Sequence, residues 1–115
     1  MGALVTPYAL PTSVTSGVTS IMTQTTSVLV LAAPAGTMRN YITHVLVTNN
    51  AAVTTTVSLV DNGNIIWSGN AGASGGGWSE NFIVPLIQPT SVKALYVISS
   101  VQASVIVAVN GFTGT

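Results

Sequence analysis

Residues 54–68 read TTTVSLVDNGNIIWS and contain the clearest structural signal in the chain. Two runs rich in β-branched residues, 54–60 and 64–68, flank the tripeptide Asp61-Asn62-Gly63. Asn-Gly between such runs is the strongest short-range signal of a β-hairpin, because a type I′ turn needs positive φ at both central positions. The segment therefore predicts two antiparallel strands joined by a tight turn, with the Asp61 side chain hydrogen-bonded to its own backbone.

Further strand signals lie on both sides of this hairpin. A continuous apolar run is typical of a strand buried on both faces, and residues 27–32 form one. Residues 39–49 alternate instead, with Tyr41, Thr43, Val45 and Val47 on one side and Ile42, His44, Leu46 and Thr48 on the other. The remaining predicted strands cover residues 78–84, 94–99 and 103–110. The last of them alternates, so Val105, Val107 and Val109 are expected to face inward and Ile106 and Ala108 outward.

Glycine, proline and asparagine separate these strands. Residues 69–77, GNAGASGGG, predict a flexible loop. Pro85 is expected to end the strand before it, and residues 88–92 predict a crossover loop. The chain lacks helical periodicity, and six or seven short strands at spacings of roughly 8–15 residues predict an all-β fold. The expected architecture is an antiparallel β-sandwich, jelly-roll-like, with an extended N-terminal arm.

That arm comprises residues 1–24, which are rich in Thr, Ser, Pro and Gly, and residues 25–115 form the predicted β-sandwich domain. Pro7 and Pro11 bias the residues before them toward extended geometry. Apolar residues spaced along the arm predict that it packs on the body of its own or a neighbouring subunit, although a disordered tail is the alternative. These interface candidates are Leu4, Val5, Tyr8, Leu10, Val14, Val18, Ile21 and Met22.

Composition excludes several classes of protein. Of 115 residues, 48% are hydrophobic and only 3% are charged, whereas disordered chains are polar and highly charged. Two basic residues are too few to bind nucleic acid. The longest apolar run, 28–36, is too short for a membrane-spanning helix of roughly 20 residues, and no signal peptide is apparent. A neutral chain favours association, so homo-oligomers are expected.

Candidates for catalysis or cofactor binding are weak. His44, Asp61 and Glu80 come from distant segments, and a metal site usually needs three or more ligands. We expect His44 to be a hydrogen-bonded structural residue, and Glu80 to pair with Arg39 or Lys93 at a rim or subunit contact. The chain lacks cysteine, a nucleophile elbow and the lysine of a P-loop. We therefore predict no enzyme activity and no cofactor.

Two tryptophans are the candidate ligand-binding or interface aromatics. Trp67 ends the second strand of the hairpin, and Trp78 opens the strand after the glycine-rich loop. They could face each other across the base of that loop. Exposed paired indoles suit stacking on a sugar ring, whereas buried indoles would belong to the core or to a subunit interface, which is the favoured interpretation.

Five segments within residues 38–112 carry a resemblance to a known group of proteins. These segments are Arg39-Asn40-Tyr41-Ile42-Thr43, Val47-Thr48-Asn49, Asp61-Asn62-Gly63 with Ile66-Trp67-Ser68-Gly69, Phe82-Ile83-Val84-Pro85-Leu86, and Val105-Ile106-Val107-Ala108-Val109-Asn110-Gly111-Phe112. With these segments the chain resembles small structural proteins of tailed bacteriophages, of the capsid decoration or head-associated type. The resemblance implies a β-sandwich subunit of a phage particle, and similar decoration proteins often form trimers on the capsid.

The favoured functional hypothesis is a capsid decoration, or cement, protein on the outer surface of the virion. It would form a homo-oligomer, with a trimer favoured, and bind the major capsid protein or another virion protein through residues 1–24. An arm of this length can span up to roughly 80 Å when fully extended. The alternatives are a carbohydrate-binding or receptor-binding module of a head or tail fibre, and a self-assembling tail or tube subunit.

Overall fold

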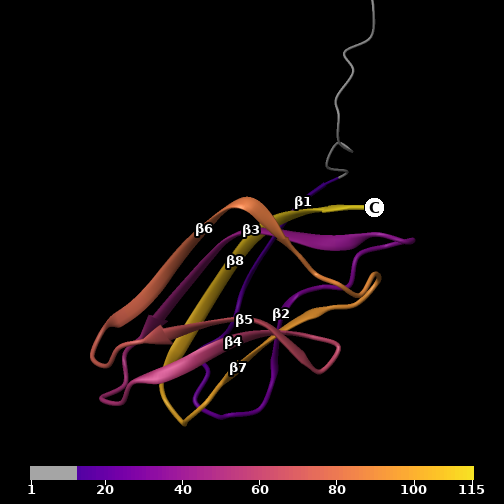
Figure 1. Ribbon diagram of the computed structural model, residues 1–115. Coiled ribbons are helices and arrows are strands. Elements are labelled where there is room, and N and C mark those ends of the chain that lie inside the picture. The colour runs from indigo at the N-terminus through magenta and orange to yellow at the C-terminus, as the bar shows by residue number, and fades with distance from the viewer. Residues whose placement is uncertain (1–12) are drawn as a thin grey trace, which may run out of the picture.

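The computed structural model describes residues 13–115, which form eight β-strands in two packed sheets (Figure 1). No helix in this range is long and apolar enough to cross a membrane. The prediction of an all-β antiparallel sandwich is confirmed. In chain order the strands are β1 (Ser13–Val18), β2 (Val28–Leu31), β3 (Arg39–Asn49), β4 (Thr55–Asp61), β5 (Asn64–Ala71), β6 (Gly76–Ile87), β7 (Leu95–Ser99) and β8 (Val105–Gly114).

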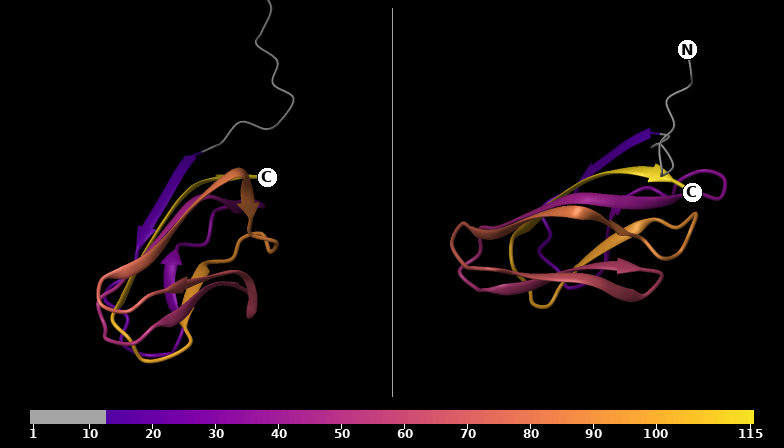
Figure 2. Two further views of the ribbon diagram at one scale, coloured as in Figure 1. Left: turned by 60° about the vertical axis from the view of Figure 1, so that its left-hand side comes forward. Right: turned by 45° about the horizontal axis from the view of Figure 1, so that its top comes forward.

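The order of the strands is that of a jelly roll. Sheet A has the order β1-β8-β3-β6 and sheet B the order β2-β7-β4-β5, and Figure 2 shows them as two layers. Strand β4 pairs with β5, β3 with β6, β2 with β7 and β1 with β8, all antiparallel. The chain is thus one long hairpin rolled across two sheets, as in the eight-stranded jelly rolls of capsid and lectin domains. Six or seven strands were predicted rather than eight, because β1 lies within the predicted arm.

The β4–β5 hairpin has the predicted turn. Asn62 and Gly63 have φ angles of 47° and 84°, so both central residues are left-handed, as a type I′ turn requires. This turn aligns β4 with β5 at its start, where Asp61 pairs with Asn64. The hairpin prediction is confirmed.

A bulge in β3 corrects the predicted alternation. Ile42 pairs with Gly111 of β8 and His44 with Asn110, which leaves Thr43 without a partner. Because side chains alternate between the two faces of a sheet, one extra residue shifts this alternation, and the residues beyond the bulge change face relative to the simple pattern. Ile42 therefore faces the core together with Val45 and Val47, and all three are buried.

A second bulge corrects the predicted end of β6. Pro85 does not end this strand, which continues to Ile87. Along β6, Asn81 pairs with His44 and Leu86 with Ile42, so residues 82–85 lie opposite the single residue Thr43. A proline is tolerated here because β6 is an edge strand and the bulge removes it from the ladder.

One predicted boundary and one predicted burial are wrong. The predicted 69–77 loop is shorter, because β5 extends to Ala71 and β6 begins at Gly76, which leaves four residues between them. Strand β2 is not buried on both faces, since the Leu29 side chain is 49% exposed. As the edge strand of sheet B, β2 buries only its core-facing side, which includes Val30 and Leu31.

The core fills the space between the sheets. The prediction that Val105, Val107 and Val109 face inward is confirmed, since all three are fully buried. Met22, a predicted arm residue, also lies in this core and forms a β-bridge with Val105. The part of the predicted arm that the structure describes is therefore built into the sandwich by β1 and Met22.

Candidate interaction surface

The titratable residues do not form a metal-binding cluster in residues 13–115, where no three His, Cys, Asp or Glu side chains come together. His44 Nε2 lies 3.1 Å from the Ser79 hydroxyl across the β3–β6 pair, on the outer face of sheet A. Glu80 accepts a hydrogen bond from Trp78 Nε1, at 3.3 Å, and Arg39 donates one to the Pro89 carbonyl. Within one chain, Glu80 and Arg39 therefore bond to other groups, and the pairing of Glu80 with Arg39 or Lys93 at a rim or subunit contact stays a prediction.

Asp61 is a structural residue, but its partners are not those of the prediction. The side chain is 3% exposed, and it does not fold back on its own turn. Oδ1 accepts a hydrogen bond from Gln88 Nε2 at 2.8 Å. Oδ2 accepts bonds from the backbone N and the hydroxyl of Thr90, at 3.2 and 2.8 Å. Asp61 thereby fixes the end of β4 to the segment that follows β6.

Gln88 extends these bonds to sheet A. Its side chain is fully buried, and its Oε1 accepts a hydrogen bond from Asn40 Nδ2 at 2.8 Å, while Nε2 also donates to the Ala94 carbonyl at 3.1 Å. Asn40 lies on β3 and Asp61 on β4, so one buried amide connects both sheets. We call Asn40, Asp61, Gln88 and Thr90 the polar clamp. The contacts above use the side-chain nitrogen of Asn40, whereas its Oδ1 is buried and has no hydrogen-bond partner.

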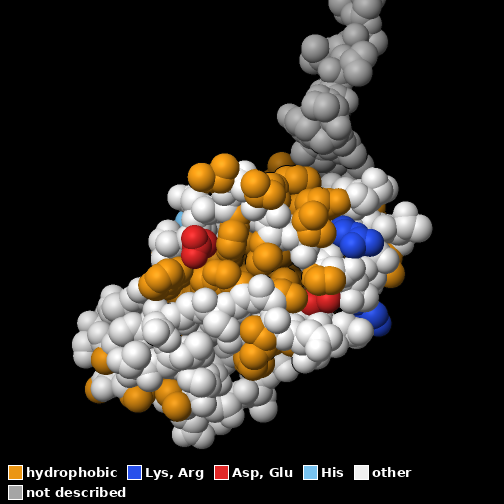
Figure 3. All heavy atoms as spheres, in the orientation of Figure 1, with side chains coloured by type: hydrophobic (Ala, Val, Ile, Leu, Met, Phe, Trp, Pro, Cys, Tyr) orange, Lys and Arg blue, Asp and Glu red, His pale blue; other side chains and the backbone are white. Residues whose placement is uncertain are grey.

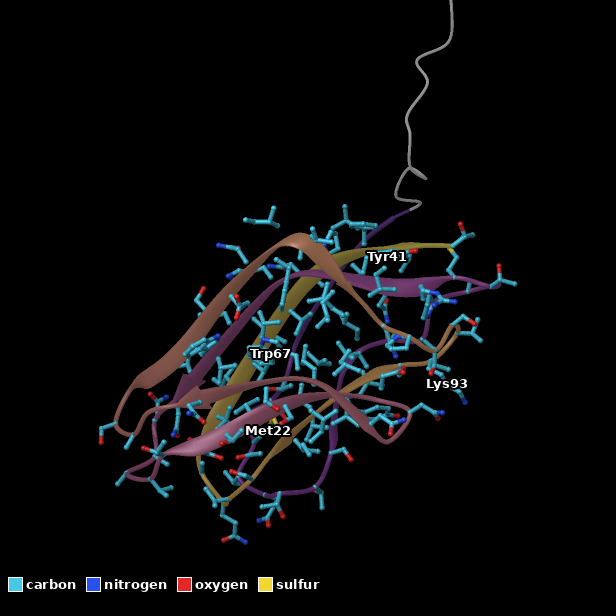
Figure 4. The ribbon with its side chains drawn as sticks, viewed as in Figure 1. Met22, Tyr41, Trp67 and Lys93 are labelled. Atoms are coloured by element: carbon cyan, nitrogen blue, oxygen red, sulfur yellow. The ribbon has the colours of Figure 1, made fainter. Side chains whose placement is uncertain are left out.

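The two tryptophans converge between the edge strands β5 and β6. A Cβ atom added at Gly69 would lie 2.7 Å from Trp67 Cη2 and 3.2 Å from Trp78 Cδ1, so both indoles cover this glycine. Trp67 is partly buried against the core, and Figure 4 places it between the two sheets. Trp78 is 44% exposed. The structure therefore brings together the two aromatics that the sequence singled out.

These indoles belong to an open side of the sandwich, where β5 and β6 are the edges of their sheets. In Figure 3, hydrophobic side chains gather in a band between these two strands. Partly buried residues line this side and pack against the core. They are Ile66, Trp67, Phe82 and Leu86.

Replacement of Trp67 by alanine is expected to lower the free energy of unfolding by about 2 kcal/mol, because the indole is partly buried and its loss opens the core to water. Trp78→Ala should cost less than half of this, since its side chain is much more exposed. Urea titrations followed by circular dichroism measure both values. Equal losses for the two variants would contradict the assigned roles.

The outer face of sheet A carries little charge and combines exposed apolar residues with neutral polar ones such as His44 and Ser79. Val14 and Val18 of β1 are 86% and 67% exposed, and they pair with Phe112 and Ala108 on this face. Leu46 of β3 is also exposed. In the described strands of sheet A, the register places one formally charged residue on this face, Arg39 at the end of β3.

The β6 bulge adds an apolar projection that was not predicted from the sequence. Ile83 is 100% exposed and Val84 79% exposed, because residues 82–85 leave the ladder. The sequence signal was Pro85, since a proline inside a strand-like run indicates an edge strand or a bulge. We had expected the proline to end the strand.

The candidate arm residues divide into three groups. Leu4, Val5, Tyr8 and Leu10 lie outside the described residues. Val14, Val18 and Ile21 are exposed. Met22 is buried and serves the core of its own chain. Within the described part of the arm, the residues available to a partner are therefore those on and next to β1.

A shallow hollow of about 380 Å³ lies beside the β4–β5 hairpin. Lys93 supplies its positive charge, and one cation with no nearby helix N-terminus or second base is a poor phosphate site. The residues that line it are Ser27, Val60, Asn62, Gly63, Lys93, Ala94 and Tyr96.

No protein-family model matches the chain, and no curated protein matches it. Among solved structures, the fold is similar to that of a chain in the capsid asymmetric unit of cyanophage Pam1. The two chains superpose with a TM-score of 0.51 at 15% sequence identity. The match covers 96% of this chain and 93% of the cyanophage chain. At this identity the similarity shows a shared fold that spans nearly the whole of both chains.

Proposed function

We propose that this chain is a structural protein of a bacteriophage particle and acts as a capsid decoration protein. The observation that carries the proposal is the similarity, over 96% of this chain, to a chain of a cyanophage capsid. The other chain is covered to 93%, so the likeness concerns two proteins of the same architecture rather than a common submotif. The proposed place of action is the outer surface of the virion.

The surface of the sandwich supports this role. Burying an ion costs several kcal/mol unless it is well paired, and the outer face of sheet A avoids that cost almost entirely. Exposed apolar residues on β1, β3 and the β6 bulge offer area for contacts between proteins. We propose that these contacts serve a homo-oligomer, with a trimer favoured, and attachment to the major capsid protein or another virion protein. The proposed role needs no catalytic group or cofactor.

The test is reconstitution on capsids of the phage whose genome carries this sequence, prepared without this protein. The full chain should bind at a fixed ratio to the capsid subunits, and electron microscopy should locate it on the outer surface. A variant that lacks residues 1–12 should fold but bind at least tenfold more weakly. The deletion must stop before Ser13, because β1 and Met22 belong to the sandwich. Absence of the full chain from the particle would overturn the proposal.

The partly exposed Trp78 indole, with the Glu80 carboxylate beside it, favours one alternative. An exposed indole face can stack on a sugar ring, and a nearby carboxylate can accept a hydrogen bond from a sugar hydroxyl. A carbohydrate-binding module would show sugar-dependent quenching of tryptophan fluorescence, and Trp78→Ala would remove the response. A decoration protein would show no such quenching with the cell-surface glycans of the host. A tube subunit, by contrast, would polymerise without any capsid.

A further inference from the structure

Strand β1 presents an unprotected sheet edge. It pairs with β8 on one side only, in an unbroken register from Ser13 to Val18. Unpaired backbone N–H and C=O groups on such an edge are a template for another strand. The strand contains no proline and no charged residue, which are the usual protections of an edge.

The other three edges are interrupted. Strand β6 has the four-residue bulge with Pro85, β5 has an irregularity next to Trp67, and β2 is a four-residue strand with an irregularity after Leu29. Each break removes backbone groups from a regular ladder. In the described part of the chain, β1 is therefore the edge best suited to accept a strand.

The hydrogen bonds at the end of β1 show which backbone groups are free. The backbone N of Thr19 donates to the Val107 carbonyl at 2.9 Å, in register with the β1–β8 pairing. Alternate residues of a strand point their backbone groups to opposite sides. Odd-numbered residues of β1 therefore bond to β8, and Val14, Ser16 and Val18 point their N–H and C=O groups to the free edge.

The twelve residues before Ser13 have a pattern that suits this edge. Proline has no N–H and is confined to positions of an edge strand that face away from the partner. Pro7 and Pro11 are both odd-numbered, so an extended strand can turn both prolines away from its partner. Its even-numbered residues then keep every N–H for pairing. Leu4, Tyr8 and Leu10 are among these even-numbered residues.

We propose that residues 4–12 of a second copy of this chain pair as an antiparallel strand with the free edge of β1. Even-numbered residues of the incoming strand bond to Val14, Ser16 and Val18, whose side chains lie on the outer face of sheet A. Paired residues share a face, so Leu4, Tyr8 and Leu10 cover the exposed Val14 and Val18. A strand from the same copy is disfavoured, because residues 10–13, LPTS, contain no glycine or asparagine for a tight hairpin turn. The inference rests on the self-association in the proposed function and identifies the strands that form it.

Proline substitutions at even-numbered and odd-numbered positions of the full chain test this proposal, because only the even-numbered positions direct their N–H toward the partner strand. Ser16→Pro removes an N–H from the free edge and leaves the bonds to β8 in place. It should weaken self-association at least tenfold, measured by sedimentation equilibrium, while circular dichroism shows a folded protein. Ser16→Thr keeps the N–H and should associate like the wild type. In the N-terminal segment, Thr6→Pro should weaken association as Ser16→Pro does, whereas Ala9→Pro, which faces away from the partner, should not.

Three results would overturn the proposal. They are a monomeric wild type, a folded Ser16→Pro variant that associates normally, and equal effects of Thr6→Pro and Ala9→Pro. Sedimentation is measured without capsids, so it reports on the strand pairing alone. Capsid binding of the same variants then separates the two proposals. Normal capsid binding by a variant that no longer self-associates would leave the decoration role intact, because attachment would then not need this pairing.

Discussion

Gly111→Ala is expected to lower the free energy of unfolding by about 3 kcal/mol. Gly111 lies in the middle of sheet A, where it pairs with Ile42 beside the β3 bulge. A Cβ atom at this position would lie 1.9 Å from the Tyr41 carbonyl oxygen and 2.9 Å from the carbonyl carbon. Both are backbone atoms that cannot rotate away, so β3 and β8 must separate where Ile42 and Val109 are fully buried.

Gly114→Ala is the matched control for this prediction. Gly114 is on the same strand and is also buried, but its added Cβ atom would meet the Tyr41 ring at 3.3 Å rather than a backbone oxygen. The ring can shift slightly, so we expect a loss below about 1 kcal/mol. Urea denaturation followed by circular dichroism measures both variants. A Gly111→Ala variant as stable as Gly114→Ala would show that the two strands do not approach this closely.

Local patterns were sufficient to predict the class of the fold. The Asn62-Gly63 turn and the alternation in residues 103–110 depend on neighbours in sequence, and both predictions are confirmed. The bulges in β3 and β6 were not predicted, because each is defined by the register with a strand far away in the chain. The residues around Thr43, 39–49, contain no glycine or proline that would indicate a bulge. Only Pro85 gave a local signal, and it was interpreted as a strand end.

The polar clamp shows a second limit of sequence reasoning. Gln88 precedes Pro89 in a segment that composition assigns to a loop, where a glutamine is normally exposed. It is fully buried because the topology brings the ends of β3, β4 and β6 to the same place. Asp61 was predicted to be structural, but its partner, Thr90, lies 29 residues away. No pattern within the hairpin could indicate that contact.

The exposed surfaces were predicted in part. The sequence identified Val14, Val18 and the two tryptophans as interface candidates, and the structure places these valines on an open sheet face and the indoles on the open side. It also assigned Met22 to the same arm, although this residue fills the core. Regular spacing of apolar residues does not show whether a strand pairs at the edge of a sheet in its own chain or with a sheet of a partner subunit. That distinction requires the register of β1 on β8.

Asp61→Ala is expected to lower the free energy of unfolding by about 4 kcal/mol, the largest effect among these predictions. The substitution removes the acceptor of three hydrogen bonds, from Gln88 Nε2 and from the backbone N and hydroxyl of Thr90. Gln88 Nε2 keeps the Ala94 carbonyl, but both Thr90 donors lose their partner in a part-buried site. The connection between β4 and the segment after β6 is then lost.

Asp61→Asn keeps the shape of the side chain but replaces one of its two acceptor oxygens by a donor, so it tests the hydrogen bonds alone. Its amide oxygen can replace one carboxylate oxygen, but its NH₂ group would face the donors on the other side, so we expect a loss of about 2 kcal/mol. Glu80→Gln, on an edge strand, should change stability by less than about 0.5 kcal/mol and controls for the loss of a negative charge. The order Asp61→Ala, Asp61→Asn, Glu80→Gln, from most to least destabilised, is expected in urea titrations. Equal stability of Asp61→Ala and Glu80→Gln would mean that the clamp does not hold the two sheets together, and the jelly roll would then depend on its apolar core and its strand ladders alone.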